Sequence, residues 1–160
     1  MSNDEEGGGT VIFRTPLASG KFPSARGGHS TVLFEQRLVV FGGHYHKGDG
    51  VFVYENDTYV LNLRTLKWKL VRTKGDVPRA RYGHSATVFG DEMYVFGGRG
   101  SGGKNFRDMD CLNLKTMTWR KIRSANALPP GRSGHSATLI GDKIVIFGGF
   151  DGKRTIDDLW

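Results

Sequence analysis

Apolar residues along this chain occur in short runs separated by glycine-rich turns, and one pattern of runs appears three times. The segments 26–43, 81–98 and 132–149 each read as a Gly-His-Ser opening, an alternating stretch, a turn, four apolar residues and two glycines. Alternation with period two is typical of a half-covered β-strand, and an unbroken run of four apolar residues is typical of a strand covered on both faces. The pattern therefore predicts three copies of one β-hairpin and no helix.

Each hairpin opens a longer unit of four expected strands. The turn begins at Gly90 in the second unit and at Gly141 in the third, where a primed hairpin turn needs positive φ. After a glycine-rich loop, a third strand is expected at 58–63 and again at 109–114. A short turn then leads to a fourth strand that carries a tryptophan.

The interval between units is constant outside one loop. His84 and His135 are 51 residues apart, as are Trp68 and Trp119. His29 and His84 are 55 residues apart, and the four extra residues fall in the loop after the first pair of glycines. Repeat scaffolds accept insertions at such surface loops, so the fold is expected to be unchanged by them.

The repeats divide the chain into a tail and a repeat region. Residues 1–9 are acidic and rich in glycine, with nothing to bury, so they are expected to be disordered. The repeat region is expected to hold a lone outer strand at 10–14, a first unit at about 26–72, a second at about 81–123 and a partial third at about 132–160.

Composition narrows the class of protein. The chain has 160 residues and a net charge of +7, and no apolar run approaches the roughly 18 residues of a membrane helix. Cys111 is the single cysteine, so no internal disulfide can form and an intracellular setting is expected, the cytoplasm first, with the nucleus left open. The basic excess favours acidic partners: nucleic acid, phosphoinositides or acidic peptides.

These units resemble kelch repeats, of the type without an attached oligomerisation domain. The shared pattern is a pair of glycines after an apolar strand, an aromatic residue at Tyr59 and Trp160, and a tryptophan near the end of the unit, at a period of about 50. Asp110 departs from the pattern at the aromatic position, and Phe13 stands where a tryptophan is expected. The structural signature comprises Gly42, Gly43, Gly97, Gly98, Gly148, Gly149, His29, His84, His135, Trp68 and Trp119.

The resemblance implies an all-β fold, a partial β-propeller of four-stranded antiparallel blades. The chain would supply one lone outer strand, two full blades and one truncated blade, whereas propellers close with about four to eight blades. Three interpretations follow: the chain is a fragment of a longer propeller, which we favour; two chains form a six-bladed ring as a homodimer; or three blades form an open arc with exposed apolar faces.

Repetition separates scaffold residues from candidate functional ones. A feature present in all three units is expected to be structural, so the repeated histidines are interpreted as structural. The serines that follow them, Ser30, Ser85 and Ser136, point to the opposite face from their neighbours and do not make a nucleophile pair with them. A feature found in a single unit is the better functional candidate.

Three possible chemical sites are weak. Gly98 to Lys104 fits a phosphate loop, but Asn105 replaces the required Ser or Thr and no helix follows. His44 and His46 lie on a loop without a nearby cysteine, so no metal site is expected. Some propellers of this family are copper-radical oxidases, but nothing pairs Cys111 with a tyrosine. We therefore expect no cofactor and no small-molecule substrate.

The loops between strands carry the remaining candidates. The connections between second and third strands, and those between successive units, are expected to emerge on one face. In some kelch proteins arginines at the position of Arg26, Arg81 and Arg132 grip acidic peptides, whereas repetition indicates a structural role, and both interpretations stay open. The full set of candidate partner-binding residues is Arg26, Arg81, Arg132, Lys47, Arg99, Lys104, Arg107, Lys153, Arg154 and Tyr45, with Lys21, Lys74 and Arg79 on the same expected face.

The expected function is a non-catalytic module for protein–protein interaction, an adaptor or scaffold that binds an acidic segment of a partner through these basic loops. The alternative is a propeller enzyme, oxidase or lyase-like, with its active site in blades outside this chain. Nucleic-acid binding is disfavoured, because no nucleic-acid module is recognised and the aromatic residues lie mainly in strands.

Overall fold

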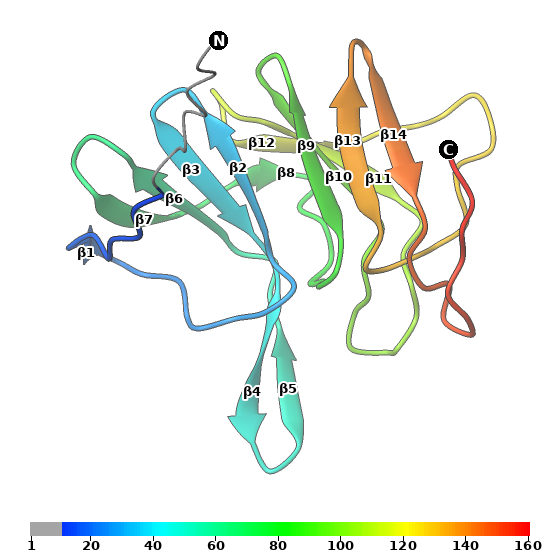
Figure 1. The fold of residues 1–160 in the computed structure, drawn as a ribbon, viewed down its shortest axis with the longest axis horizontal. Coiled ribbons are helices and arrows are strands. Elements are labelled where there is room, and N and C mark those ends of the chain that lie inside the picture. The colour runs from blue at the N-terminus through cyan, green and yellow to red at the C-terminus, as the bar shows by residue number, and fades with distance from the viewer. Residues whose placement is uncertain (1–10) are drawn as a thin grey trace, which may run out of the picture.

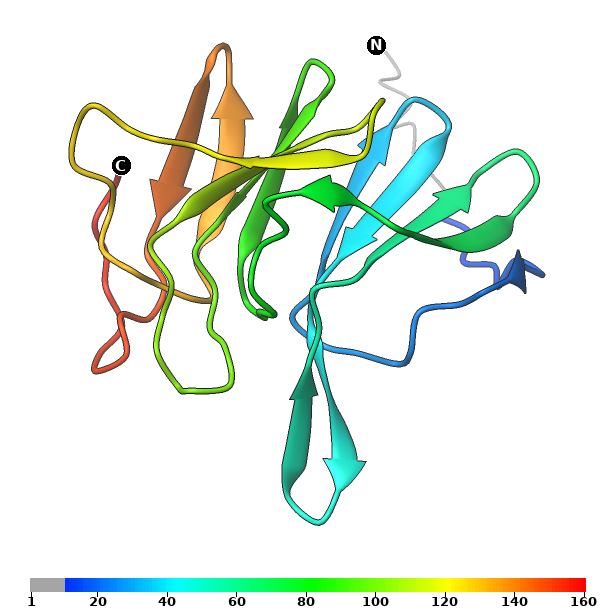
Figure 2. The same cartoon turned by 180° about the vertical axis from the view of Figure 1, so that it is seen from behind.

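The protein is described here as a computed structural model that covers residues 11–160, so the expected disorder of 1–9 lies outside the described residues. The described chain is all-β, with fourteen strands and no helix. Three blades stand side by side in an open arc (Figures 1 and 2). Residues 11–160 contain no helix of the length and apolarity that a membrane span requires.

The first blade contains the four antiparallel strands that the repeat predicts. They are β2 (Ser30–Phe34), β3 (Arg37–Phe41), β6 (Thr58–Asn62) and β7 (Lys67–Val71), ordered from the inside of the arc outward. β3 lies between two other strands and is almost wholly buried, which explains its unbroken apolar run.

The second blade repeats this order. Its strands are β9 (Ser85–Phe89), β10 (Glu92–Phe96), β11 (Met109–Asn113) and β12 (Thr118–Lys121). Gly90 has a φ of 59° at the β9–β10 turn, as a primed turn requires. In the first blade Glu35 takes the same turn position with a φ of 52°, so the turn is kept without a glycine.

The third blade is partial within this chain. It contains β13 (Ser136–Ile140) and β14 (Lys143–Phe147), with Gly141 at a φ of 61° between them. Ile146 and Trp160 exchange two backbone hydrogen bonds of 2.9 Å, so the last residues begin to pair with β14 as a third strand. The expected partial β-propeller of two full blades and one incomplete blade is thus confirmed.

Each full blade also has a short fifth strand that the sequence pattern did not predict. β1 (Ser19–Gly20) pairs in parallel with β7, and β8 (Lys74–Gly75) pairs in parallel with β12. A Cβ on Gly75 would lie 2.2 Å from the carbonyl oxygen of Trp119, so only glycine fits against the outer strand. The equivalent distance at Gly20, to the carbonyl oxygen of Trp68, is 2.3 Å.

The predicted strand at 10–14 is wrong for the described residues. Residues 11–18 form no strand, and Phe13, expected at a tryptophan position, is 92% exposed. The reason is that the equivalent strands β7 and β12 pair with the third strand of their own blade, and no such strand precedes β1 in the described residues.

The loop with the four-residue insertion is a β-hairpin. β4 (His44–Gly48) and β5 (Val51–Tyr54) pair with a bulge between His46 and Gly48 and project from the arc (Figures 1 and 2). His44 packs against the rings of Tyr54 and Tyr82, at centroid distances of 6.1 and 4.4 Å. The expected irregular loop is therefore an ordered element fixed at its base by aromatic contacts.

The main core lies between the first and second blades. Val39 and Phe41 of β3 meet Met93 of β10 and Trp119 of β12, and all four are at most 2% exposed. The rings of Phe41 and Trp119 are 4.8 Å apart, whereas Trp68, at the matching position of the first blade, is only half-buried. The tryptophan of the second blade therefore packs onto the first blade.

Candidate functional site on the loop face

The loops between the second and third strands of each blade, together with the connections between blades, form the end of the arc from which β4 and β5 project. We call this end the loop face. The repeated arginines lie beneath it: the Arg81 and Arg132 side chains have no exposed surface, and that of Arg26 is 3% exposed. Each donates to the carbonyl oxygen of the first glycine of its blade's glycine pair.

Each of these arginines also binds an aspartate that ends the same loop. Arg26 is paired with Asp57, Arg81 with Asp108 and Arg132 with Asp158, each through both terminal nitrogens. Hydrogen bonds from Arg132 and Trp160 lower the pKa of Asp158 to about 2. A planar guanidinium fork suits this bidentate geometry, which a lysine could not reproduce.

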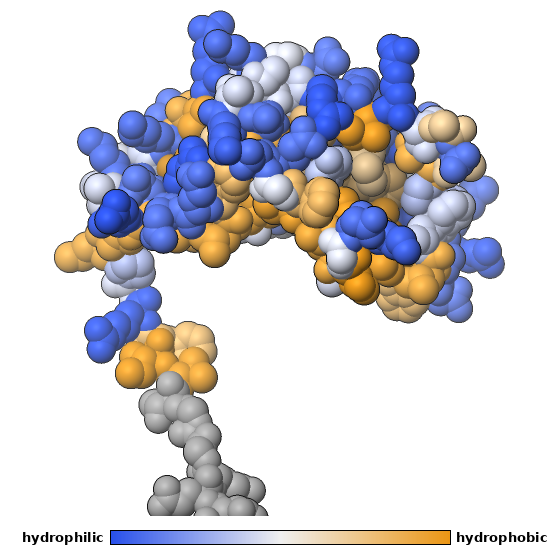
Figure 3. Space-filling model, turned by 90° about the horizontal axis from the view of Figure 1, so that it is seen from above, coloured by the Kyte–Doolittle hydropathy of each residue, from blue (hydrophilic) through white to orange (hydrophobic). Residues whose placement is uncertain are grey.

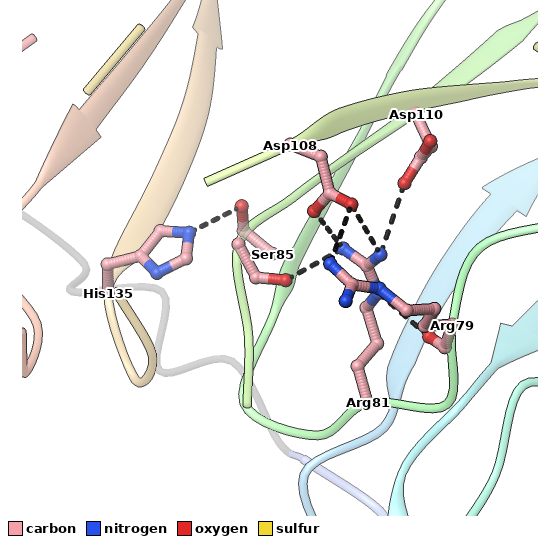
Figure 4. A network of polar contacts seen from close by, with 7 residues as sticks. Arg79, Arg81, Ser85, Asp108, Asp110 and His135 are labelled. Atoms are coloured by element: carbon pink, nitrogen blue, oxygen red, sulfur yellow. Dashed lines mark hydrogen bonds and ion pairs between the residues drawn. The ribbon is translucent and has the colours of Figure 1, made fainter. Parts of the chain in front are cut away.

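Arg81 makes the largest of these networks (Figure 4). Besides Asp108 and Gly97, it donates to the buried carboxylate of Asp110 at 3.2 Å and to the carbonyl oxygen of Arg79 at 3.1 Å. Burial raises the pKa of Asp110 to about 6, against the opposing pull of Arg81. The departure of Asp110 from the aromatic pattern thus gives this arginine a second carboxylate.

The prediction that Arg26, Arg81 and Arg132 contact a partner is therefore corrected. Their donors are already used inside the protein, and their burial leaves no surface for a peptide. The structural alternative fits the contacts. The feature of the sequence that could have indicated this structural role is the interval of 26 to 31 residues from each arginine to its aspartate.

The paired glycines let backbone from the next blade approach. Gly98 has a φ of 90° and donates to the carbonyl oxygen of Arg132 at 2.8 Å, and Gly43 donates in the same way to Arg81. A Cβ on Gly98 would lie 2.9 Å from the Cβ of His84. Both the positive φ and the close packing therefore require glycine at this position.

The repeated histidines join neighbouring blades. His84 Nε2 and Ser30 Oγ lie 2.9 Å apart, and His135 Nε2 and Ser85 Oγ lie 2.8 Å apart (Figure 4). Burial, reinforced by Arg81, lowers the pKa of His84 to about 3; burial and Arg132 lower that of His135 to about 4. The serine that was not expected to pair with the histidine of its own unit is thus hydrogen-bonded to the histidine of the next unit. His29 is exposed.

These buried histidines predict acid sensitivity. Below about pH 6.5 the unfolded chain gains protons that native His84 and His135 do not accept, so the free energy of unfolding falls as the pH drops toward 4. Asp110 opposes this trend between about pH 6 and 4, because its raised pKa favours protonation of the native state.

The test therefore uses an Asp110→Asn background. From about pH 7 to pH 5, Asp110→Asn should lose about 2 kcal/mol more unfolding free energy in urea than Asp110→Asn/His84→Gln. An equal loss in both variants would contradict the assigned role of His84.

Exposed cations gather in a groove between the second and third blades. The groove has a volume of about 740 Å³ and is lined by Arg79, Lys104, Arg107 and Lys153, with Phe106 beneath them. The guanidinium of Arg79 lies 4.3 Å from the centroid of the Phe106 ring, and its side chain is 73% exposed. We call this the basic groove.

The acidic residues of the basic groove are engaged in internal contacts. Asp108 accepts hydrogen bonds from both terminal nitrogens of Arg81. Asp151 accepts hydrogen bonds from the backbone N–H groups of Lys153 and Arg154. The contact between Asp108 and Arg79 is loose, with 3.9 Å between Arg79 Nη2 and Asp108 Oδ2. The surface that remains for a ligand is therefore positively charged.

The other predicted partner-binding residues are dispersed. Arg99 is half-buried, with its guanidinium 6.0 Å from the Phe150 ring, and Arg154 lines a separate, smaller hollow. Tyr45 and Lys47 lie on the projecting hairpin, away from the basic groove. Lys21 and Lys74 were expected on the loop face, and this prediction is wrong. Lys74 is part of β8 and Lys21 follows β1, so both lie beside the outer strands.

The remaining candidates for chemistry were the Cys111 thiol and a metal site. Burial raises the pKa of the Cys111 thiol to about 12, and the side chain lies inside the second blade. Among residues 11–160, no three His, Cys, Asp or Glu side chains are grouped so that they could hold a metal ion.

Repeated blades joined by buried arginine and histidine contacts, with variable charged loops at one end, define a β-propeller segment with a loop surface suited to ligand binding. Residues 28–160 match the family model described as the KLHDC2/KLHL20/DRC7 Kelch-repeats domain. The chain belongs to the kelch-repeat family, whose members generally serve as non-enzymatic protein-interaction modules.

Three relatives show the range of proteins that contain such a segment. Human Kelch domain-containing protein 3 is 34% identical over 99% of this chain and 46% of its own length. Tip elongation aberrant protein 1 of Schizosaccharomyces pombe is 36% identical over 94% of this chain and 13% of its own length. Acyl-CoA-binding domain-containing protein 5 of Arabidopsis thaliana is 35% identical over 84% of this chain and 20% of its own length. The chain thus spans less than half the length of these relatives.

Proposed function

We propose that this chain is a non-catalytic interaction module that binds an acidic segment of a partner protein in the basic groove of the loop face. One observation carries the proposal: Arg79, Lys104, Arg107 and Lys153 converge on one groove while its carboxylates are turned to internal donors. The general role of kelch repeats in binding proteins supports the same conclusion.

The groove suits carboxylates that flank an apolar or aromatic side chain. The exposed guanidinium of Arg79 can form a bidentate pair with a carboxylate while it stays stacked on Phe106. Lys104, Arg107 and Lys153 are exposed and add long-range attraction, which raises the rate of encounter and weakens with salt.

Charge reversal tests this proposal. Arg107→Glu/Lys153→Glu should weaken the binding of a fluorescein-labelled hexaglutamate peptide by about tenfold or more, measured by fluorescence anisotropy at low ionic strength. Both side chains are exposed, so the variant should keep the wild-type unfolding free energy within about 0.5 kcal/mol.

The matched control is Arg64→Glu/Lys143→Glu, which changes the net charge equally at exposed positions away from the loop face. It should weaken peptide binding by no more than about threefold, through the overall field alone. Equal losses in the two variants would show that net charge governs binding, and the basic groove would then not be the site.

A further inference from the structure

A second basic surface lies at the opposite end of the first two blades. There, Arg37, Lys67 and Lys69 of the first blade and Met117 of the second line a cleft of about 490 Å³. We call it the rim cleft. β3 runs from Arg37 at this end to Phe41 at the loop face, so the rim cleft is separated from the basic groove by the length of the blade. Figure 3 views the molecule from this end and shows hydrophilic surface over much of it.

Strand register explains how the cleft is built. Arg37, Asn62 and Lys67 are direct neighbours across β3, β6 and β7, and Val39, Val60 and Lys69 form the next row on the same face. Deeper in the junction this face packs against the second blade around Trp119. At the rim end of this face, Lys67 and Lys69 take the place of apolar residues, and the cleft opens between the two blades.

The corresponding corner of the second blade is neutral. Glu92 stands at the position of Arg37, and Arg120 at the position of Lys69. The Glu92 carboxylate accepts a hydrogen bond of 2.8 Å from Arg120 Nη2 and one of 2.6 Å from the Tyr94 hydroxyl. The charge of this corner is therefore cancelled within the blade, and an open cationic corner is a feature of the first blade.

The two lysines of the rim cleft lack such partners. In the described part of the chain, the salt bridges at this end join Arg37 to Glu35, Lys115 to Asp91 and Arg120 to Glu92, and neither Lys67 nor Lys69 takes part. Lys67 and Lys69 therefore present positive charge to the cleft that no salt bridge within residues 11–160 neutralises.

The floor of the rim cleft is apolar. Val60, Val71 and Met117 line it beside the lysines, and Met117 packs against the main core. A bare phosphate would leave this floor uncovered, and the one arginine fork is already paired with Glu35. A methionine adapts its shape to an inserted side chain, and lysine ammonium groups attract carboxylates on either side of it.

We infer that the rim cleft is a second protein-docking site, for an extended acidic segment that inserts one apolar side chain between flanking carboxylates. The site is independent of the basic groove, so both ends of the same blade pair can be occupied at once. A module of this kind can bridge two partners.

The Met117 methyl group provides a local reporter. In protein with 13C-labelled methionine methyls, assigned with a Met117→Leu variant, acetyl-Glu-Glu-Leu-Glu-Glu-amide should shift the Met117 signal saturably. Acetyl-Glu-Glu-Ser-Glu-Glu-amide should bind about tenfold more weakly, because it loses the buried leucine side chain. Equal affinity for the two peptides would overturn the inference, since only charge would then be recognised.

Variants locate the response. Lys67→Glu/Lys69→Glu should weaken the Met117 response about tenfold or more, whereas Arg123→Glu/Lys143→Glu, an equal charge change on exposed residues outside the cleft, should weaken it by no more than about threefold. Arg107→Glu/Lys153→Glu should also weaken it by no more than about threefold, through the overall field alone, which separates this test from that of the basic groove.

Three other outcomes would also overturn the inference. The first is a Met117 signal that neither peptide moves. The second is a Met117 response to the leucine peptide that Lys67→Glu/Lys69→Glu leaves intact. The third is a larger response to inositol hexakisphosphate than to the leucine peptide, because the cleft would then recognise phosphate rather than an acidic segment.

Discussion

Replacing Arg81 with methionine is expected to lower the free energy of unfolding by about 3 to 5 kcal/mol. Arg81 is fully buried and compensates the carboxylates of Asp108 and Asp110 while it donates to Gly97 of the glycine pair. Methionine fills similar space but leaves both carboxylates without their cation in a buried setting. Urea unfolding, followed by circular dichroism, measures the loss.

Two further variants make the Arg81 test specific. Arg79→Met lies two residues away and is largely exposed, so it should change the unfolding free energy by no more than about 0.5 kcal/mol. Arg81→Met/Asp108→Asn/Asp110→Asn should recover part of the loss, because it removes the stranded charges. A wild-type stability for Arg81→Met would contradict the structural role and reopen the partner-binding one.

Trp119→Ala is expected to have an effect of similar size, about 3 to 5 kcal/mol. The indole is 2% exposed and fills the junction between the first two blades against Phe41, so truncation leaves a cavity. Trp119→Phe should cost less than about 1.5 kcal/mol, because the buried indole N–H has no hydrogen-bond partner among residues 11–160.

Trp68→Ala is the matched control, at the same position one blade earlier. Trp68 is half-buried because no blade precedes it in the described chain, so its truncation should cost less than half as much as that of Trp119. Urea unfolding measures both. Equal losses would show that the tryptophans stabilise their own blades rather than the junctions between them.

The repeat in the sequence predicted the blades well, for a physical reason. Each strand has a period of two and each turn needs a glycine, so local patterns around Gly90 and Gly141 specify the hairpins. The structural role of His84 also followed from repetition. Its partner did not, because Ser30 lies 54 residues away, on the neighbouring blade.

The errors arose where a local pattern has two physical meanings. The sequence motif around Arg81 is compatible with a buried guanidinium group and with an exposed one. Only the position of Asp108 in the fold shows that the group is buried and paired inside the protein. Residues 10–14 have the apolar pattern of a strand, but an outer strand also needs the third strand of its own blade as a partner, and none precedes β1 in the described residues. The hairpin of β4 and β5 was missed because its sequence occurs in one unit, without a repeat to reveal it.

The two proposed sites were accessible to sequence reasoning to different degrees. Lys104, Arg107 and Lys153 of the basic groove were predicted as loop cations before their convergence was known. The rim cleft was not predicted, because Arg37 and Lys67 become neighbours only through the register of β3, β6 and β7. Charges on regular strands are usually solvated, and only the open junction makes these a candidate site.

The proposed function is the binding of an acidic segment by the loop face, in the basic groove. The most direct measurement is a map of backbone amide shifts in 15N-labelled protein on titration with hexaglutamate at low ionic strength. Saturable shifts are expected at residues 104–108, 131 and 152–153, which line the groove. Saturable shifts elsewhere that leave these amides unmoved would contradict the proposed function.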